Sequence, residues 1–113
     1  MSVTTRVWIA GAGGRLGSAL CHRFDRNTEC KLVTSDRDVP VEDGKQVGRF
    51  ADLNHPDVII NCAGLTDVRR CEECPEEAYK INALGARNLA VAARRIDAKL
   101  IQISTDDVFD GTA

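Results

Sequence analysis

The stretch Gly11-Ala12-Gly13-Gly14-Arg15-Leu16-Gly17 decides the fold that this sequence predicts. It follows an apolar run at residues 6–10 that is typical of a buried strand, and after it apolar residues recur at helical spacing: Leu16, Ala19, Leu20 and Phe24. Gly11 permits a tight turn, Gly14 leaves room for a phosphate to approach the backbone, and Gly17 lets the helix pack closely. The N–H groups and dipole at a helix start attract an anion. We therefore expect a dinucleotide diphosphate at this GxxGxxG turn; the alternative is a flexible surface turn.

Two charged residues follow the second predicted strand, residues 31–34. Asp36 stands where a carboxylate can accept a hydrogen bond from the adenosine ribose, roughly 20 residues after the glycine turn. Arg37, the next residue, can pair with a 2′-phosphate or lie over the adenine ring. Because both residues are present, the sequence leaves the choice between NAD and NADP open. The alternative interpretation is a solvated Asp-Arg-Asp turn.

Short apolar strands alternate with helices along the rest of the chain. Two more strands are predicted at residues 58–62 and 100–104, a helix at 42–53, and a long helix that opens at Pro75, where proline suits the first position. Strands that are apolar on both faces indicate a parallel sheet covered by helices on each side. We predict an α/β fold: a Rossmann-type doubly wound sheet of four strands in the spatial order 3-2-1-4, with residues 1–113 forming one NAD(P)-binding domain.

Composition and charge limit the classes of binding partner and the compartment that we expect. The 113 residues carry 15 basic and 17 acidic side chains, a net charge of -2, which gives no reason to expect nucleic acid or an anionic membrane. No apolar run approaches a membrane span, and the first residues do not resemble a signal peptide, so a cytoplasmic protein is expected. The five cysteines read as reduced thiols. Cys71 and Cys74 form a CxxC, for which we expect a polar turn and no metal; a zinc or redox role is the minor alternative.

Three further segments carry a resemblance to a known family. Residues 57–68 (DVIINCAGLTDV), 71–90 (CEECPEEAYKINALGARNLA) and 102–111 (QISTDDVFDG) follow the glycine turn in order. Together with GxxGxxG they resemble the dTDP-4-dehydrorhamnose reductases, which are extended short-chain dehydrogenases/reductases. The resemblance implies NAD(P)H-dependent reduction of the 4-keto group of dTDP-4-dehydro-L-rhamnose in dTDP-rhamnose biosynthesis, with a nucleotide sugar as substrate and NADP or NAD as cofactor.

The resemblance also assigns roles to residues. Thr105 and Asn82 would be catalytic, Thr105 by hydrogen-bonding the keto oxygen and Asn82 by ordering the active site. The cofactor would be bound by the glycine turn, the adenosine side and the end of the third strand: Gly11, Gly14, Arg15, Leu16, Gly17, Asp36, Arg37, Ala63, Gly64 and Thr66. Structural alternatives stand beside these roles, since Asn82 can simply bridge backbone groups, Ser104–Asp106 can cap a helix, and a packed helix also explains small residues at 63 and 64.

Departures from the family pattern keep other functions open. Asp107 stands where the family has tyrosine, which favours a sugar-nucleotide epimerase or 4,6-dehydratase as an alternative, and Arg69 replaces a carboxylate. The family's proton donor is the tyrosine of a YxxxK motif, whereas the single tyrosine here, Tyr79, is followed by KINA. We expect residues 1–113 to supply the cofactor-binding part of the reductase and to be inactive alone. An exposed sheet edge and uncovered apolar faces should lead to dimerisation, aggregation or marginal stability. A non-catalytic NADP-binding subunit, like the β subunit of methionine adenosyltransferase, is the other alternative.

Overall fold

Four strands alternate with three helices in the described part of the chain. The structure is a computed structural model that describes residues 4–13, 15–24, 29–63 and 75–103. The elements are β1 (Thr5–Ala10), α1 (Arg15–Phe24), β2 (Cys30–Ser35), α2 (Gly44–Asn54), β3 (Val58–Asn61), α4 (Pro75–Arg95) and β4 (Lys99–Gln102). The predicted alternation of strands and helices is confirmed, and each strand lies within two residues of its predicted bounds.

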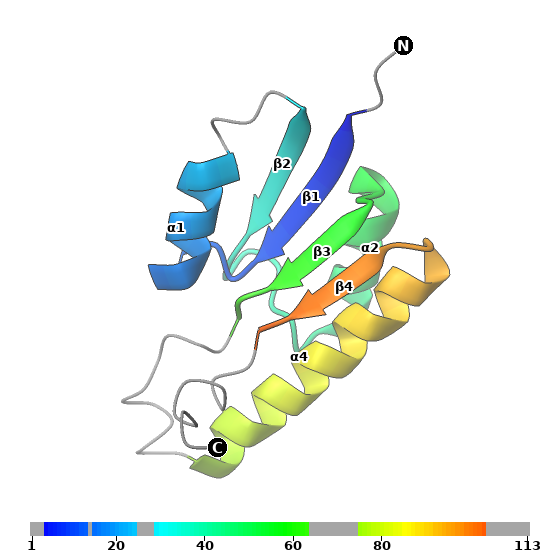
Figure 1. The fold of residues 1–113 in the computed structure, drawn as a ribbon. Helices are drawn as coiled ribbons and strands as arrows, with labels where there is room; N and C mark the ends of the chain where they lie inside the picture. The colour runs from blue at the N-terminus through cyan, green and yellow to red at the C-terminus, as the bar shows by residue number, and fades with distance from the viewer. Residues whose placement is uncertain (1–3, 14, 25–28, 64–74, 104–113) are drawn as a thin grey trace, which may run out of the picture.

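The strands form one parallel sheet in the order β2-β1-β3-β4 (Figure 1). The predicted doubly wound α/β class is confirmed, but the predicted order 3-2-1-4 is wrong. The prediction assumed that the second crossover continues in the direction of the first and places the third strand beyond β2. Instead, the chain returns over β1, and β3 pairs with the free edge of β1. Right-handed crossovers in opposite directions require helices on opposite faces of the sheet.

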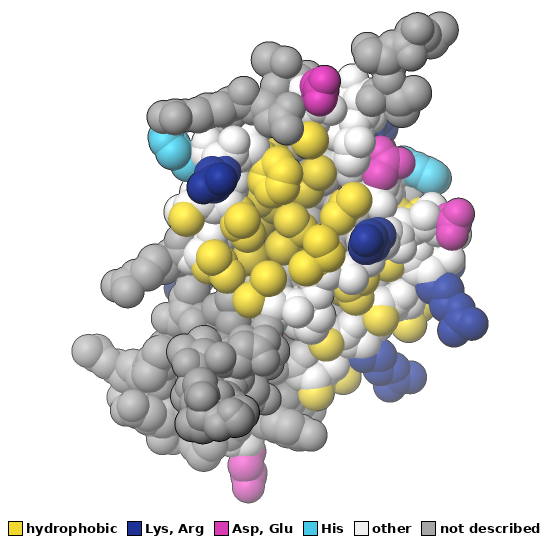
Figure 2. Space-filling view, in the orientation of Figure 1, with side chains coloured by type: hydrophobic (Ala, Val, Ile, Leu, Met, Phe, Trp, Pro, Cys, Tyr) yellow, Lys and Arg dark blue, Asp and Glu magenta, His cyan; other side chains and the backbone are white. Residues whose placement is uncertain are grey.

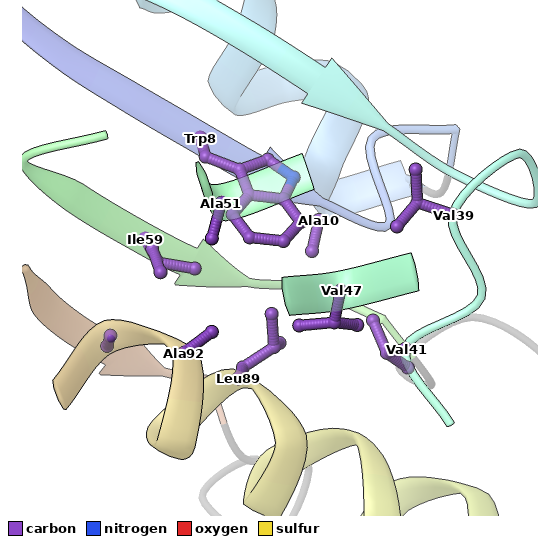
Figure 3. Packing of buried hydrophobic residues seen from close by; sticks show 10 residues of the cluster. Trp8, Ala10, Val39, Val41, Val47, Ala51, Ile59, Leu89 and Ala92 are labelled. Atoms are coloured by element: carbon purple, nitrogen blue, oxygen red, sulfur yellow. The ribbon is translucent and has the colours of Figure 1, made fainter. Parts of the chain in front are cut away.

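The helices cover the two faces as that rule demands. On one face, α1 packs Leu20 and Phe24 over Val7 and Ile9 of β1. On the other, α2 and α4 pack together over Trp8, Ala10 and Ile59 (Figure 3). The predicted apolar stripe of α1 is only partly buried, because Ala19 is exposed and Leu16 retains 37% of its accessible surface.

Trp8 occupies the centre of the larger core. Its side chain is fully buried, and its indole Nε1–H donates to Ser35 Oγ at 2.8 Å. Its ring lies 4.6 Å from that of Phe50, centroid to centroid, with a tilt of 37°. Trp8 therefore joins β1 to the end of β2 and to helix α2.

Capping residues define both ends of α2. The Asp43 side chain caps the helix by accepting from the backbone N–H groups of Lys45 and Gln46. His55 ends it in the left-handed conformation at φ 48°. Between the helices, Arg95 of α4 forms an ion pair with Asp52 at 2.6 Å.

Part of the α1 face of the sheet is open. Ile101 of β4 lies beside Ile60 of β3 on this face and is 39% exposed. Figure 2, drawn in the orientation of Figure 1, shows hydrophobic side chains gathered over the strands next to α1. Among the residues that the structure describes, no helix is both long and apolar enough to cross a membrane.

Candidate functional site

The glycine turn leaves β1 in a conformation that excludes side chains. Gly11 has φ +79°, in the left-handed region. The N–H groups of Gly11 and Ala12 both donate to the Ser35 carbonyl oxygen at 2.9 Å, which ties the turn to the end of β2. A Cβ on Gly11 would lie 2.5 Å from the Ala63 nitrogen, so the turn also touches the backbone that follows β3.

Helix α1 begins directly against this turn. Gly17 is buried, and a Cβ there would lie 2.8 Å from Ala12 Cα and even closer to the Gly11 carbonyl oxygen. Ser18 Oγ donates to the Ala12 carbonyl oxygen at 3.1 Å. The first N–H groups of a helix lack an intrahelical acceptor, and in α1 these belong to Arg15, Leu16 and Gly17. The bare backbone and these amides together form an anion-binding geometry.

The carboxylate of Asp36 lies against the same turn. A Cβ on Gly13 would lie 2.6 Å from Asp36 Oδ2, so the absence of a side chain at Gly13 makes room for the carboxylate. The Asp36 N–H donates to Asp38 Oδ1 at 2.7 Å, which shapes the bend after β2. Arg37 between them is exposed. No role was predicted for Gly13 from the sequence; its position in the turn, facing the end of β2, was the available signal.

A buried amide organises the end of β3. The Asn61 side chain donates from Nδ2 to Gln102 Oε1 at 3.1 Å and accepts from the Ala63 N–H at Oδ1 at 3.0 Å. Asn61 is only 2% exposed. These two hydrogen bonds satisfy its amide, as the burial of a polar group requires. No role was predicted for Asn61 from the sequence, since an asparagine at the end of a strand is a common turn signal.

The Cys62 thiol does not have the character of a reactive nucleophile. Burial raises the pKa of the Cys62 thiol, and the nearby Cys21 thiol raises it further, so the reactive thiolate of Cys62 is disfavoured. Cys71 and Cys74 lie outside the described residues. Within the described ranges, no group of three or more His, Cys, Asp or Glu side chains is placed to hold a metal ion.

The other predicted site residues are placed only in part. Asn82 lies in α4 with an exposed side chain, and α4 starts at the carboxyl end of the sheet (Figure 1). Gly14, Gly64, Thr66 and Thr105 lie outside the described residues. Among the described ones, the structure brings Gly11, Gly17, Asp36 and Ala63 together at the carboxyl end of β1 and its two neighbours. Open parallel sheets bind ligands at that end, where neighbouring crossovers diverge.

The doubly wound sheet and its glycine turn define the chain as a Rossmann-like α/β protein. A family model described as the RmlD substrate binding domain matches residues 5–113. The chain belongs to this family, the dTDP-4-dehydrorhamnose reductase family, and the resemblance inferred from its motifs is confirmed.

Individual relatives agree with this assignment. A dTDP-4-dehydrorhamnose reductase of Mycobacterium tuberculosis is 42% identical over 106 residues, which are 94% of this chain and 34% of that protein. The crystal structure of the Bacillus anthracis dTDP-4-dehydrorhamnose reductase in complex with NADP has a TM-score of 0.86 and 38% identity, and the match covers 100% of this chain and 40% of that one. The crystal structure of a dTDP-4-dehydrorhamnose reductase from Clostridium acetobutylicum has a TM-score of 0.82 and 40% identity, and the match covers 96% of this chain and 39% of that one. The chain thus spans about a third of the length of the curated relatives it matches.

Proposed function

We propose that residues 1–113 are the dinucleotide-binding part of an NAD(P)H-dependent reductase that acts on the 4-keto group of dTDP-4-dehydro-L-rhamnose. The observation that carries the proposal is the turn between β1 and α1, where the backbone of Gly11 and Gly17 is packed too closely for any side chain. Bare backbone at a helix start, at the carboxyl end of a parallel sheet, suits a diphosphate. Membership of the reductase family and the NADP complex of the Bacillus anthracis relative support the cofactor class.

Different residues of the proposed site would contact different parts of the dinucleotide. The Gly11–Gly17 turn, with the amides of Arg15 and Leu16, would hold the diphosphate, and Asp36 and Arg37 would meet the adenosine ribose. Ala63 would lie along the nicotinamide-side ribose. The roles of the remaining residues are proposed from the family motifs alone. Gly14, Gly64 and Thr66 would contact the cofactor. Thr105 would contact the substrate, and Asn82 would help to order the active site.

Hydride transfer to a ketone also requires a proton for the forming alkoxide. In the family the proton comes from the tyrosine of a YxxxK motif, and residues 1–113 contain no such motif. We therefore expect the 113-residue chain to bind the dinucleotide without turning over substrate. Among the described cysteines, Cys30 and Cys62 are free thiols, which fits the reducing cytoplasm in which we expect the protein.

Titration calorimetry of the 113-residue chain with NADH and NADPH tests the proposal. We expect Asp36→Ala to weaken NADH about tenfold, since a hydrogen bond from the ribose to a charged acceptor is lost. Arg37→Ala should weaken NADPH by a similar factor and leave NADH unchanged, because only NADPH carries the 2′-phosphate. Glu42→Ala, an exposed carboxylate in the loop before α2, is the control and should alter neither. A folded chain that binds neither dinucleotide at millimolar concentration would refute the proposed function.

A further inference from the structure

We propose that Asn61 is a positioning residue for the nicotinamide half of the cofactor, acting through the turn that follows β3. The inference rests on the proposed dinucleotide site. Its basis is the buried Asn61 amide, which links the turn at Ala63 to Gln102 of β4.

The Asn61 side chain forms hydrogen bonds to two parts of the chain, the turn after β3 and strand β4. Its Oδ1 fixes the Ala63 N–H at 3.0 Å, and its Nδ2 donates at 3.1 Å to Gln102, its register partner on β4. The backbone after Asn61 is also anchored, since the Cys62 N–H donates to the Ala10 carbonyl oxygen at 2.8 Å. The Asn61 side chain therefore sets the direction in which the chain leaves the sheet after Cys62.

The turn fixed by Asn61 touches the proposed diphosphate site. The Ala63 nitrogen would be 2.5 Å, and its Cα 2.6 Å, from a Cβ on Gly11. Because the β3 turn packs on the backbone of the β1 turn, a shift of Ala63 changes the wall of the site beside Gly11. Ala63 has no side chain beyond Cβ with which to compensate for such a shift.

The sheet order decides which half of the ligand this wall meets. β1 lies between β2 and β3, so a diphosphate at the β1 turn sits between the ends of those two strands. Asp36 marks the β2 side as the adenosine side. The other half of the dinucleotide must then extend over the end of β3, where Asn61 positions Ala63.

A purely structural role for Asn61 predicts a different result. If the amide only joins β3 to β4, its loss weakens the fold and with it the binding of every ligand equally. If it positions Ala63, its loss affects ligands that carry the nicotinamide half more than ligands that end at the diphosphate. ADP retains the adenosine and the diphosphate, so the comparison of NADH with ADP separates the two roles.

The experiment measures the dissociation constants of NADH and ADP by calorimetry on the 113-residue chain and four variants. Asn61→Val and Asn61→Ala both remove the acceptor for the Ala63 amide, and valine keeps a β-branched side chain in the strand should the alanine variant not fold. Asn61→Ser keeps a hydroxyl acceptor for the turn but cannot reach β4. Gln102→Leu removes the partner on β4 and leaves the turn contact intact.

We expect Asn61→Val to weaken NADH binding about tenfold, because the partly buried Ala63 N–H loses its acceptor. The ADP affinity should stay within about twofold of wild type. Asn61→Ser and Gln102→Leu should stay near wild type for both ligands. The inference is overturned if NADH and ADP weaken together in Asn61→Val, if neither weakens, or if Asn61→Ser fails to restore NADH affinity. Wild-type chain that binds ADP as tightly as NADH would overturn the inference and leave the diphosphate site standing, whereas binding of neither would refute the proposed function itself.

Discussion

At the scale of single residues, the shape of the candidate site depends on backbone that carries no side chain, as at Gly11 and Gly17. Gly11→Ala tests this constraint on the turn. We expect a loss of about 1–3 kcal/mol in the free energy of unfolding, because alanine is strained at positive φ and its Cβ would meet the backbone of Ala63. Gly48→Ala is the matched control within α2, where a Cβ would find only the end of the Arg95 side chain at 3.4 Å. That substitution should stabilise by about 0.5–1 kcal/mol. Urea unfolding of both variants makes the measurement, and equal effects would contradict the assigned strain.

Gly11 and Gly17 were predicted from the spacing of the turn, and Asp36 from its place after β2, because each belongs to a local pattern. Gly13 and Asn61 were not predicted, since their importance depends on partners distant in sequence: the Asp36 carboxylate for Gly13 and Gln102 for Asn61. Local pattern reveals a residue that serves its own turn but not one that serves another strand.

At the scale of elements, the existence and type of each strand and helix could be predicted, but their spatial order could not. Hydrophobic periodicity and glycine or proline breaks are local, and they located the four strands. Which edge of β1 receives β3 depends on how Trp8, Ile59 and α2 pack after the chain has crossed the sheet. The stripe on α1 was overestimated for the same reason, since the described sheet reaches only part of that helix.

The N-terminal cap of α2 gives its stability a predictable pH dependence. Hydrogen bonds from the Gln46 side chain, and then from backbone N–H groups, hold the pKa of the Asp43 carboxyl below its ordinary value of 3.8. A carboxyl with a lowered folded pKa stabilises the fold above the unfolded value, and the stabilisation is lost as the pH falls through the folded pKa. We therefore expect the advantage of wild type over Asp43→Asn, which keeps a capping side chain, to shrink on acidification.

Urea midpoints of wild type and Asp43→Asn at about pH 6 and about pH 3, on either side of the ordinary aspartate pKa, provide the comparison. Asp43→Ala, which removes the cap, should have the lowest midpoint at the higher pH. A difference between wild type and Asp43→Asn that does not change with pH would rule out this contribution of Asp43.

On the scale of the whole molecule, the sheet is covered unequally. Helices α2 and α4 close one face, while α1 covers the other beside β1 and leaves Ile101 exposed next to Ile60. An apolar surface flanked by a sheet edge promotes association between chains. We expect the 113-residue chain to self-associate in a concentration-dependent manner.

Ile101→Lys should reduce that self-association, because a charge on an open strand face opposes pairing with a second chain. Leu53→Lys is the control: Leu53 belongs to α2 and is 76% exposed, so it is the more accessible side chain but lies away from the open face. Sedimentation velocity over a concentration series distinguishes the variants. Monomeric wild type at all concentrations, or an equal effect of the two lysines, would argue against the open face as the contact.

The position of the single tryptophan, Trp8, makes its intrinsic fluorescence a probe of the proposed site. The indole of Trp8 is bonded to Ser35, whose carbonyl oxygen also accepts the amides of the glycine turn. Its light emission is therefore sensitive both to the docking of β2 and to events one residue away, at Asp36. Indole fluorescence overlaps the absorption band of a dihydronicotinamide, so occupancy by NADH can be followed as quenching of Trp8 without any label.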